Sequence, residues 1–127
     1  FADMMIFDAL VCNVDRHGGN YGLLVDNETN KPIRFAPVFD NGLSLFQSAM
    51  PEDFANLDEY AKTRYPAYDN VTFEDVVKAF ISERQKAELR RLINFKFKRH
   101  PRYNLPKERL SAIEKFLQKR IGEFLNF

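Results

Sequence analysis

The sequence predicts a mainly α-helical fold with one small antiparallel β-hairpin, an α+β arrangement that occupies residues 1–127 as one unit. Apolar residues recur at helical spacing near both ends of the chain, and two short apolar runs flank a cluster of turn-forming residues. Apolar residues make up 45% of the 127 residues and include 13 Phe. A chain of this size can bury a substantial core, so we expect one domain or one lobe of a larger domain.

The first predicted element is a helix over residues 1 to about 13. Its apolar residues lie three and four positions apart, as they would on one face of a helix: Met5, Ile6, Ala9 and Leu10. Residues 14–20 are mostly polar and include Gly18 and Gly19, which indicates a loop after this helix.

A β-hairpin should follow the loop. Residues 21–25 and 33–39 are predicted strands, and residues 26–32 between them are rich in Asp, Asn, Thr and Pro, which favour turns. In an antiparallel hairpin, the loop before the first strand and the loop after the second lie at the same end. We therefore expect Asn20 and Asp40 to be neighbours although the whole hairpin separates them in sequence.

The chain after this hairpin is predicted to be irregular and then helical. Residues 43–70 contain two prolines and scattered aromatic residues, and a long loop of this kind is usually functional or mobile. Thr72 is a favourable N-cap for a helix over residues 73–81. Ser82 should open another helix that continues to about residue 98.

Pro106 is predicted to lie in the first turn of the last helix, where proline is favourable. This helix has an apolar stripe at three- and four-residue steps: Leu110, Ile113, Leu117, Ile121 and Phe124. Residues 84–102 are rich in Lys and Arg, which we interpret as a solvated helix face. The aromatic residues interleaved with these cations are predicted to lie in the core: Phe95, Phe97 and Tyr103.

Composition excludes several classes of protein. Charged residues make up 29% of the chain and the net charge is +1, which fits neither a disordered chain nor a strongly basic one. No apolar run approaches the ~20 residues that a membrane span requires. Cys12 cannot form a disulfide framework alone, so we expect a buried thiol in a reducing, cytoplasmic setting. The two histidines, His17 and His100, are too few for a zinc site.

Two short segments carry residue types suited to phosphoryl transfer. Residues 13–20 read N-V-D-R-H-G-G-N, and residues 37–42 read P-V-F-D-N-G. Transfer of a γ-phosphoryl group needs metal ions on the phosphates, an oriented hydroxyl group and positive charge near the transferring group. Either segment alone could merely shape a turn, but the two segments joined by a hairpin favour a catalytic site.

The residues of these segments can be assigned to those needs. Mg²⁺ prefers hard oxygen ligands and keeps several waters, so Asn20 and Asp40 are predicted to hold it. Asp15 would lie near the acceptor hydroxyl, and Arg16 or His17 would supply positive charge near the phosphate. For His17 a second role is equally open, in which its ring packs inside the loop and hydrogen-bonds a backbone carbonyl to fix Asp15.

The motif D-R-H-x-x-N at residues 15–20, followed by A-P-V-F-D at residues 36–40, resembles the catalytic and metal-binding motifs of HipA-like serine/threonine kinases. The resemblance is specific over about residues 1–46 and architectural beyond them. These bacterial enzymes have a two-lobed kinase fold and often act as toxins. The resemblance implies a C-terminal kinase lobe, with ATP and Mg²⁺ as cofactors, a protein substrate and an antitoxin as a further partner.

By the same resemblance, Asp15 would be the catalytic base, and Asn20, Asp40 and Arg16 would bind the nucleotide, the first two through Mg²⁺. A kinase also needs a glycine-rich loop and a strand lysine, and no such motif occurs in these 127 residues. We therefore expect an upstream lobe to supply the adenine site, and residues 1–127 alone to fold without catalysing.

Two alternative functions stay open. The D-R-H-x-x-N motif also resembles that of phosphoinositide kinases, and the D-x-G at residues 40–42 resembles the D-F-G of ordinary kinases, so a lipid or small-molecule kinase is the first alternative. The second is a non-catalytic binding module that contacts nucleic acid or an acidic protein through residues 84–102. The kinase interpretation predicts no membrane partner and at most indirect contact with nucleic acid.

Overall fold

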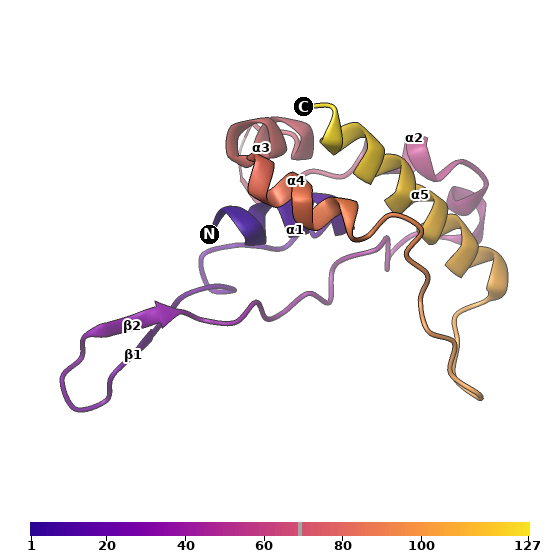
Figure 1. The fold of residues 1–127 in the computed structure, drawn as a ribbon. Helices are drawn as coiled ribbons and strands as arrows, with labels where there is room; N and C mark the ends of the chain where they lie inside the picture. The colour runs from indigo at the N-terminus through magenta and orange to yellow at the C-terminus, as the bar shows by residue number, and fades with distance from the viewer. Residues whose placement is uncertain (69) are drawn as a thin grey trace.

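A computed structural model describes residues 1–68 and 70–127; Asp69, which falls within the predicted irregular stretch, lies outside the described residues. The helices form one body, and the hairpin and a loop near residue 100 project from it (Figure 1). This confirms the predicted mainly α fold with one antiparallel hairpin. The elements are α1 (Ala2–Val11), β1 (Leu23–Val25), β2 (Pro32–Phe35), a 3₁₀ helix η1 (Pro51–Asn56), α2 (Leu57–Ala61), α3 (Phe73–Phe80), α4 (Glu83–Arg90) and α5 (Lys107–Leu125).

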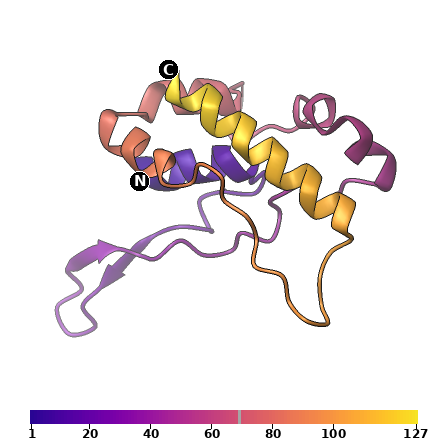
Figure 2. The ribbon, with the colours of Figure 1, turned by 45° about the vertical axis from the view of Figure 1, so that its right-hand side comes forward.

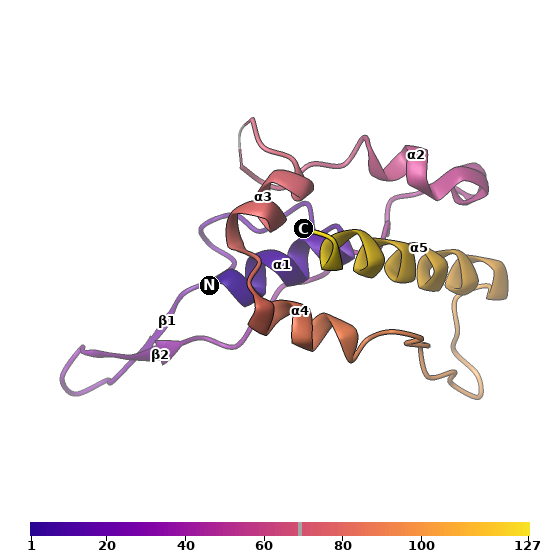
Figure 3. The ribbon, with the colours of Figure 1, turned by 45° about the horizontal axis from the view of Figure 1, so that its top comes forward.

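The core forms where α1 packs against α3 and α5. Figure 3 shows α1 flanked by α3 and α4. The apolar stripe predicted on the last helix is buried as expected. Phe116 on the same helix packs edge to face against Phe46, with ring centroids 4.7 Å apart. Cys12 is a buried core residue, also as predicted, and burial raises the pKa of its thiol to about 11.

The hairpin is shorter than predicted. Its strands pair Leu23 with Phe35 and Leu24 with Arg34. The last backbone hydrogen bond beyond β2 runs from the Ala36 N–H to the Gly22 carbonyl at 2.9 Å. The second strand therefore ends at Phe35, before the predicted residue 39.

The turn of the hairpin is organised by one carboxylate. The Asp26 carboxylate accepts the N–H groups of Glu28 and Thr29 at 3.0 and 2.7 Å. Asn30 then takes a left-handed conformation with φ of 56°, which Asn tolerates better than most residues. The predicted turn is therefore fixed by local polar contacts, whereas the side chains of both strands remain largely exposed.

The helix after Thr72 is confirmed, and its start has the expected cap. The Thr72 hydroxyl accepts the Asp75 N–H at 3.1 Å, and the Asp75 carboxylate accepts the Thr72 N–H at 2.9 Å. The prediction that residues 43–70 are irregular is wrong in part, because η1 and α2 occupy the middle of that stretch.

The predicted helix to residue 98 is also too long, because α4 ends at Arg90. Asn94 adopts φ of 65°, and its N–H donates to the Gln118 side chain at 2.8 Å. The Phe97 N–H donates to the Glu114 carboxylate at 2.9 Å. Side chains of α5 therefore replace the carbonyl acceptors that a continued helix would have used.

Because the helix ends at Arg90, the prediction that the aromatic residues after it lie in the core needs correction. Phe97 is half-buried against the core, but Phe95 is 38% exposed and Tyr103 is 79% exposed. The core prediction is therefore wrong for Phe95 and Tyr103, because it assumed helical spacing that ends at Arg90. Within residues 1–68 and 70–127, no helix combines the length and apolar character needed to cross a membrane.

Candidate active site

The loop that carries the D-R-H-x-x-N motif begins at the C-terminal end of α1. Cys12 adopts a left-handed φ of 52°, which ends the helix two residues before the predicted boundary. The Asn13 N–H then bonds back to the Asp8 carbonyl at 2.9 Å. The Asn13 amide donates to the Asp8 carboxylate at 3.0 Å and accepts the Asp15 N–H at 3.1 Å, so this buried side chain fixes the start of the loop.

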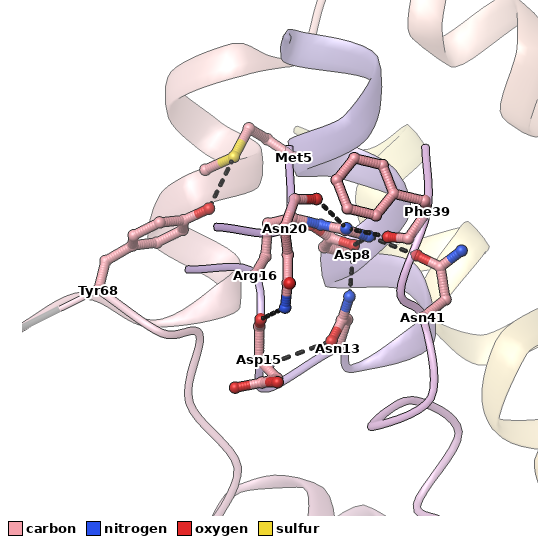
Figure 4. A network of polar contacts seen from close by, with 9 residues as sticks. All are labelled: Met5, Asp8, Asn13, Asp15, Arg16, Asn20, Phe39, Asn41 and Tyr68. Carbon is pink, nitrogen blue, oxygen red and sulfur yellow. Dashed lines mark hydrogen bonds and ion pairs between the residues drawn. The ribbon is translucent and has the colours of Figure 1, made fainter. Parts of the chain in front are cut away.

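Arg16 is the centre of the site, and its side chain is only 1% exposed. Its Nε and Nη2 donate to the two oxygens of the Asp8 carboxylate at 2.8 and 2.9 Å, a two-pronged ion pair inside the protein (Figure 4). Nη2 also donates to the Asn41 side chain, and Nη1 donates to the carbonyls of Asn20 and Phe39. All five N–H donors of the guanidinium are thus used within the protein.

These bonds bring the two predicted segments together. The carbonyls of Asn20, before the hairpin, and of Phe39, after it, share one nitrogen of Arg16. Two backbone bonds add to this contact: Val14 N–H to the Leu43 carbonyl at 3.1 Å and Leu45 N–H to the Val11 carbonyl at 2.7 Å. The loop before the hairpin and the segment after it therefore meet at one place.

The electrostatics of Arg16 reflect the same surroundings. Its hydrogen bonds to Asp8 raise the pKa of the guanidinium, burial opposes this, and the charges of Asp8 and Asp40 add to the increase. Asp40 is itself exposed and has a left-handed φ of 52°, a conformation that Asp tolerates.

Three oxygen-bearing side chains at this junction have no hydrogen-bond donor from the described residues: Asp15, Asn20 and Asp40. The Asn20 amide nitrogen donates to the Asp15 carbonyl at 2.7 Å, so the oxygen is the end of that amide left without a partner. The Asp15 side chain is 40% exposed, and its carboxylate points away from the buried network (Figure 4).

These oxygens fit Mg²⁺ by their chemistry. Mg²⁺ is usually held by one or two carboxylates together with waters and substrate phosphates. Two carboxylates and one amide oxygen meet that need. Within the described part of the chain no group of three His, Cys, Asp or Glu side chains could hold a metal, so the donor set here depends on an amide, waters and phosphates to complete it.

His17 is exposed and contacts the inside of its own loop. Its Nδ1 accepts the Gly19 N–H at 3.0 Å, and its Nε2 lies 4.0 Å from the nearer Asp15 carboxylate oxygen. A Cβ on Gly19 would lie 3.0 Å from the ring, so glycine permits this close approach. This contact inside the loop is with a backbone N–H, and not with a backbone carbonyl as predicted.

Sequence reasoning missed the residues that hold the site in place: Asp8, Asn13 and Asn41. Asp8 is 4% exposed and Asn13 is fully buried. One signal was available, because Asp8 interrupts the otherwise apolar run over residues 4–12. A carboxylate on the buried face of a helix needs a partner, and the nearest cation in sequence after it is Arg16.

Comparison with known proteins gives one partial match. The chain is 38% identical over 63 residues to the serine/threonine-protein kinase CtkA of Helicobacter pylori. The aligned region is 46% of this chain but 19% of that kinase, so the chain spans about a fifth of its relative. No protein-family model matches the chain, and no solved structure matches it. Part of the chain is therefore kinase-like.

Proposed function

We propose that this chain is the C-terminal lobe of a HipA-like kinase, the lobe that carries the catalytic loop and the metal-binding residues. The whole kinase would transfer the γ-phosphoryl group of ATP to a serine or threonine hydroxyl of a protein substrate. The observation that carries the proposal is the Arg16 network, which joins the D-R-H-x-x-N loop to the F-D-N-G segment. The side chains that the family resemblance assigns to catalysis belong to these two segments: Asp15 and Asn20 to the loop, and Asp40 to the F-D-N-G segment.

Two of these side chains would bind the metal. The Asn20 amide oxygen and the Asp40 carboxylate would hold Mg²⁺, which when bound supplies positive charge to the β- and γ-phosphates. The bond from the Asn20 amide nitrogen to the Asp15 carbonyl keeps the amide oxygen turned toward the site. The buried Arg16 side chain bonds to the residues on either side of Asp40, the Phe39 carbonyl and the Asn41 side chain, and so holds the segment that carries this carboxylate.

Asp15 would act on the acceptor. Its exposed carboxylate accepts the proton of the substrate hydroxyl as the hydroxyl oxygen bonds to the γ-phosphorus and the bond to the leaving ADP oxygen breaks. The proton then passes from Asp15 to solvent. The main chain of Asp15 is fixed at both its N–H and its carbonyl, by Asn13 and Asn20, so the carboxylate is held in place for this task.

Arg16 and His17 take positioning roles in this proposal. All donors of Arg16 are committed to protein acceptors, which supports a role in holding the loops and not in contacting phosphate. The contact of the His17 Nδ1 with the Gly19 N–H supports a loop-fixing role for this side chain. Its Nε2 lies 4.0 Å from the Asp15 carboxylate, too far for a hydrogen bond.

The remaining features of the whole protein rest on the resemblance. They are an upstream lobe for adenine, a cytoplasmic setting, and a toxin role with an antitoxin partner. A buried, unpaired Cys12 agrees with a reducing compartment. Arrest of growth when the whole protein is expressed, and relief of that arrest by a neighbouring gene product, would support the toxin role.

The proposal is tested by phosphoryl transfer from labelled ATP with a chain that includes the nucleotide-binding lobe. Asp15→Asn should lower turnover about 10²- to 10⁴-fold, the usual effect of losing an acid–base group, without weakening nucleotide binding. Asp40→Asn should abolish turnover and also weaken Mg²⁺-dependent nucleotide binding. Glu28→Gln, which removes an exposed carboxylate from the hairpin turn, is the matched control and should retain activity.

Two results would contradict the proposal. One is turnover by Asp15→Asn equal to that of the natural sequence. The other is phosphorylation of phosphoinositide vesicles but of no protein, which would establish the lipid-kinase alternative. Robust transfer by residues 1–127 alone would show that the adenine site lies within this chain.

A further inference from the structure

The basic stretch divides into two parts that differ in how their charges are balanced. Each cation of α4, and Arg91 directly after it, has an acidic partner. Arg84 pairs with Asp3 at 2.6 Å, and Arg91 pairs with Glu88 at 2.8 Å. Lys86 and Arg90 both pair with Glu83, at 3.2 and 3.8 Å. The following segment, residues 95–107, contains no Asp or Glu. We call this segment the basic loop; its cations are Lys96, Lys98, Arg99, Arg102 and Lys107.

One buried carboxylate from outside the basic loop balances only part of this charge. Glu114 on α5 is 2% exposed and pairs with Arg99 at 2.8 Å and Lys96 at 3.3 Å. No acidic residue in the described part of the chain pairs with the other three cations, Lys98, Arg102 and Lys107. The basic loop projects from the body beyond the N-terminal end of α5, so these cations face solvent on a protruding segment (Figure 2).

The basic loop has a defined conformation although it is not helical. At its base the Phe97 N–H bonds to Glu114 at 2.9 Å. At its tip the His100 Nδ1 accepts the N–H groups of Arg102 and Tyr103 at 3.0 and 3.1 Å. The Asn104 side chain accepts the His100 N–H at 2.8 Å. A loop that is ordered before binding loses less conformational entropy when a partner arrives.

An aromatic platform stands at this tip. The rings of His100 and Tyr103 stack with centroids 5.2 Å apart and planes 27° from parallel. Tyr103 is 79% exposed, so the face of its ring that does not contact His100 is open to solvent. Burial therefore does not explain the aromatic residue at this position. A flat ligand could stack on the open face of the Tyr103 ring, opposite His100.

We propose that the basic loop is a binding surface for single-stranded nucleic acid, with a base stacked on Tyr103 and phosphates beside Lys98 and Arg102. Proteins that bind single strands without sequence preference combine cations along the backbone with aromatic rings under the bases. An acidic peptide would use the cations but not the stacked rings, so both observations together favour nucleic acid. The surface does not depend on the proposed phosphoryl transfer, and a failure of either proposal leaves the other standing.

The test is fluorescence anisotropy of labelled oligo(dT) and oligo(U) of eight nucleotides with the 127-residue chain, at several salt concentrations. Tyr103→Ala should weaken binding at least about fivefold, the lower end of the effect of losing one stacked base, whereas Tyr103→Phe should bind normally. The double change Lys98→Gln and Arg102→Gln should reduce the slope of log K against log salt by about 1.4, or ~0.7 for each phosphate contact.

Lys115→Gln is the matched control, because Lys115 is an exposed cation on α5 outside the basic loop. It should change the affinity less than about twofold, as one distant screened charge would. Equal binding by Tyr103→Ala and the natural sequence would overturn the proposal. So would a loss with Lys115→Gln as large as that with Arg102→Gln, or tighter binding of a Glu-rich peptide than of an oligonucleotide of equal charge. The comparison of oligo(dT) with oligo(U) identifies DNA or RNA as the preferred strand.

Discussion

The D-R-H-x-x-N loop, residues 13–20, and the basic loop, residues 95–107, are irregular apart from Lys107, which opens α5, and a buried charged side chain makes the main polar contacts of each. In the D-R-H-x-x-N loop that side chain is Arg16, which is 1% exposed, pairs with the buried Asp8 carboxylate and also donates to an amide and two carbonyls. In the basic loop it is an anion, Glu114, which is 2% exposed and accepts from a backbone N–H and two cations.

The difference lies in how the buried charge is balanced. Arg16 is paired inside the protein with the buried Asp8, so little net charge lies beneath the exposed Asp15. Glu114 on α5 is instead paired with two cations of the basic loop, and it lessens the repulsion among the cations displayed there. Arg16 and Glu114 hold the loops, whereas Asp15 and Tyr103 are proposed to act there.

Removal of Arg16 should have the largest effect on stability. Arg16→Leu would leave the Asp8 carboxylate buried without its partner, which typically costs about 3–5 kcal/mol. Arg16→Lys should be destabilised as well, because lysine has three donors and cannot form the two-pronged bond to Asp8. Urea unfolding monitored by circular dichroism measures both losses.

The matched control for Arg16 is Asp15→Asn, which changes a partly exposed carboxylate in the same loop. Its free energy of unfolding should stay within about 0.5 kcal/mol of that of the natural sequence. If Asp15→Asn and Arg16→Leu lowered the free energy of unfolding by similar amounts, Asp15 would also be needed to hold the loop, and the proposed division of roles between the two residues would be wrong.

Removal of the Glu114 charge should have a smaller, pH-dependent effect. The hydrogen bond from Arg99 lowers the pKa of Glu114 to about 2 in the folded state, from an ordinary value of 4.5. A carboxyl group with a depressed folded pKa stabilises the protein fully above its unfolded pKa, and this contribution is lost as the pH falls toward the folded pKa. The stability advantage of the natural sequence over Glu114→Gln should therefore be constant above about pH 5 and shrink between pH 4.5 and 2.

Thermal unfolding of both proteins across that pH range provides the measurement, and Glu108→Gln on the first turn of α5 provides the control. A difference between Glu114→Gln and the natural sequence that does not change with pH would show that the carboxylate acts by shape and not by charge.

Several parts of the fold could be predicted because their causes are local in sequence. The Thr72–Asp75 cap, the apolar stripe of α5 and the turn at Asp26 all depend on residues within a few positions of each other. The end of α4 could not be predicted in this way. It depends on Glu114 and Gln118, which belong to another helix and take over the backbone N–H groups of residues 94 and 97.

The candidate site shows the same division. The hairpin predicted that the segments before and after it would meet, and the bonds from Arg16 to the Asn20 and Phe39 carbonyls agree with this. The residues that hold them could not be assigned from spacing, because the bond from Arg16 to Asp8 joins a loop to the buried face of a helix. Whether Arg16 faces inward or toward a phosphate depends on that partner, and only the structure reveals it.

The central claim is that the D-R-H-x-x-N loop and the F-D-N-G segment present one set of oxygen ligands to a divalent cation. Titration of the ¹⁵N-labelled chain with Mn²⁺, a paramagnetic substitute for Mg²⁺, tests it through the broadening of backbone amide signals. The account predicts that broadening at the lowest Mn²⁺ concentrations is centred on residues 15–20 and 39–42 and falls off with distance from them, is lost in Asp40→Asn and is kept in Glu28→Gln. Broadening centred elsewhere in the chain, or an unchanged pattern in Asp40→Asn, would contradict it.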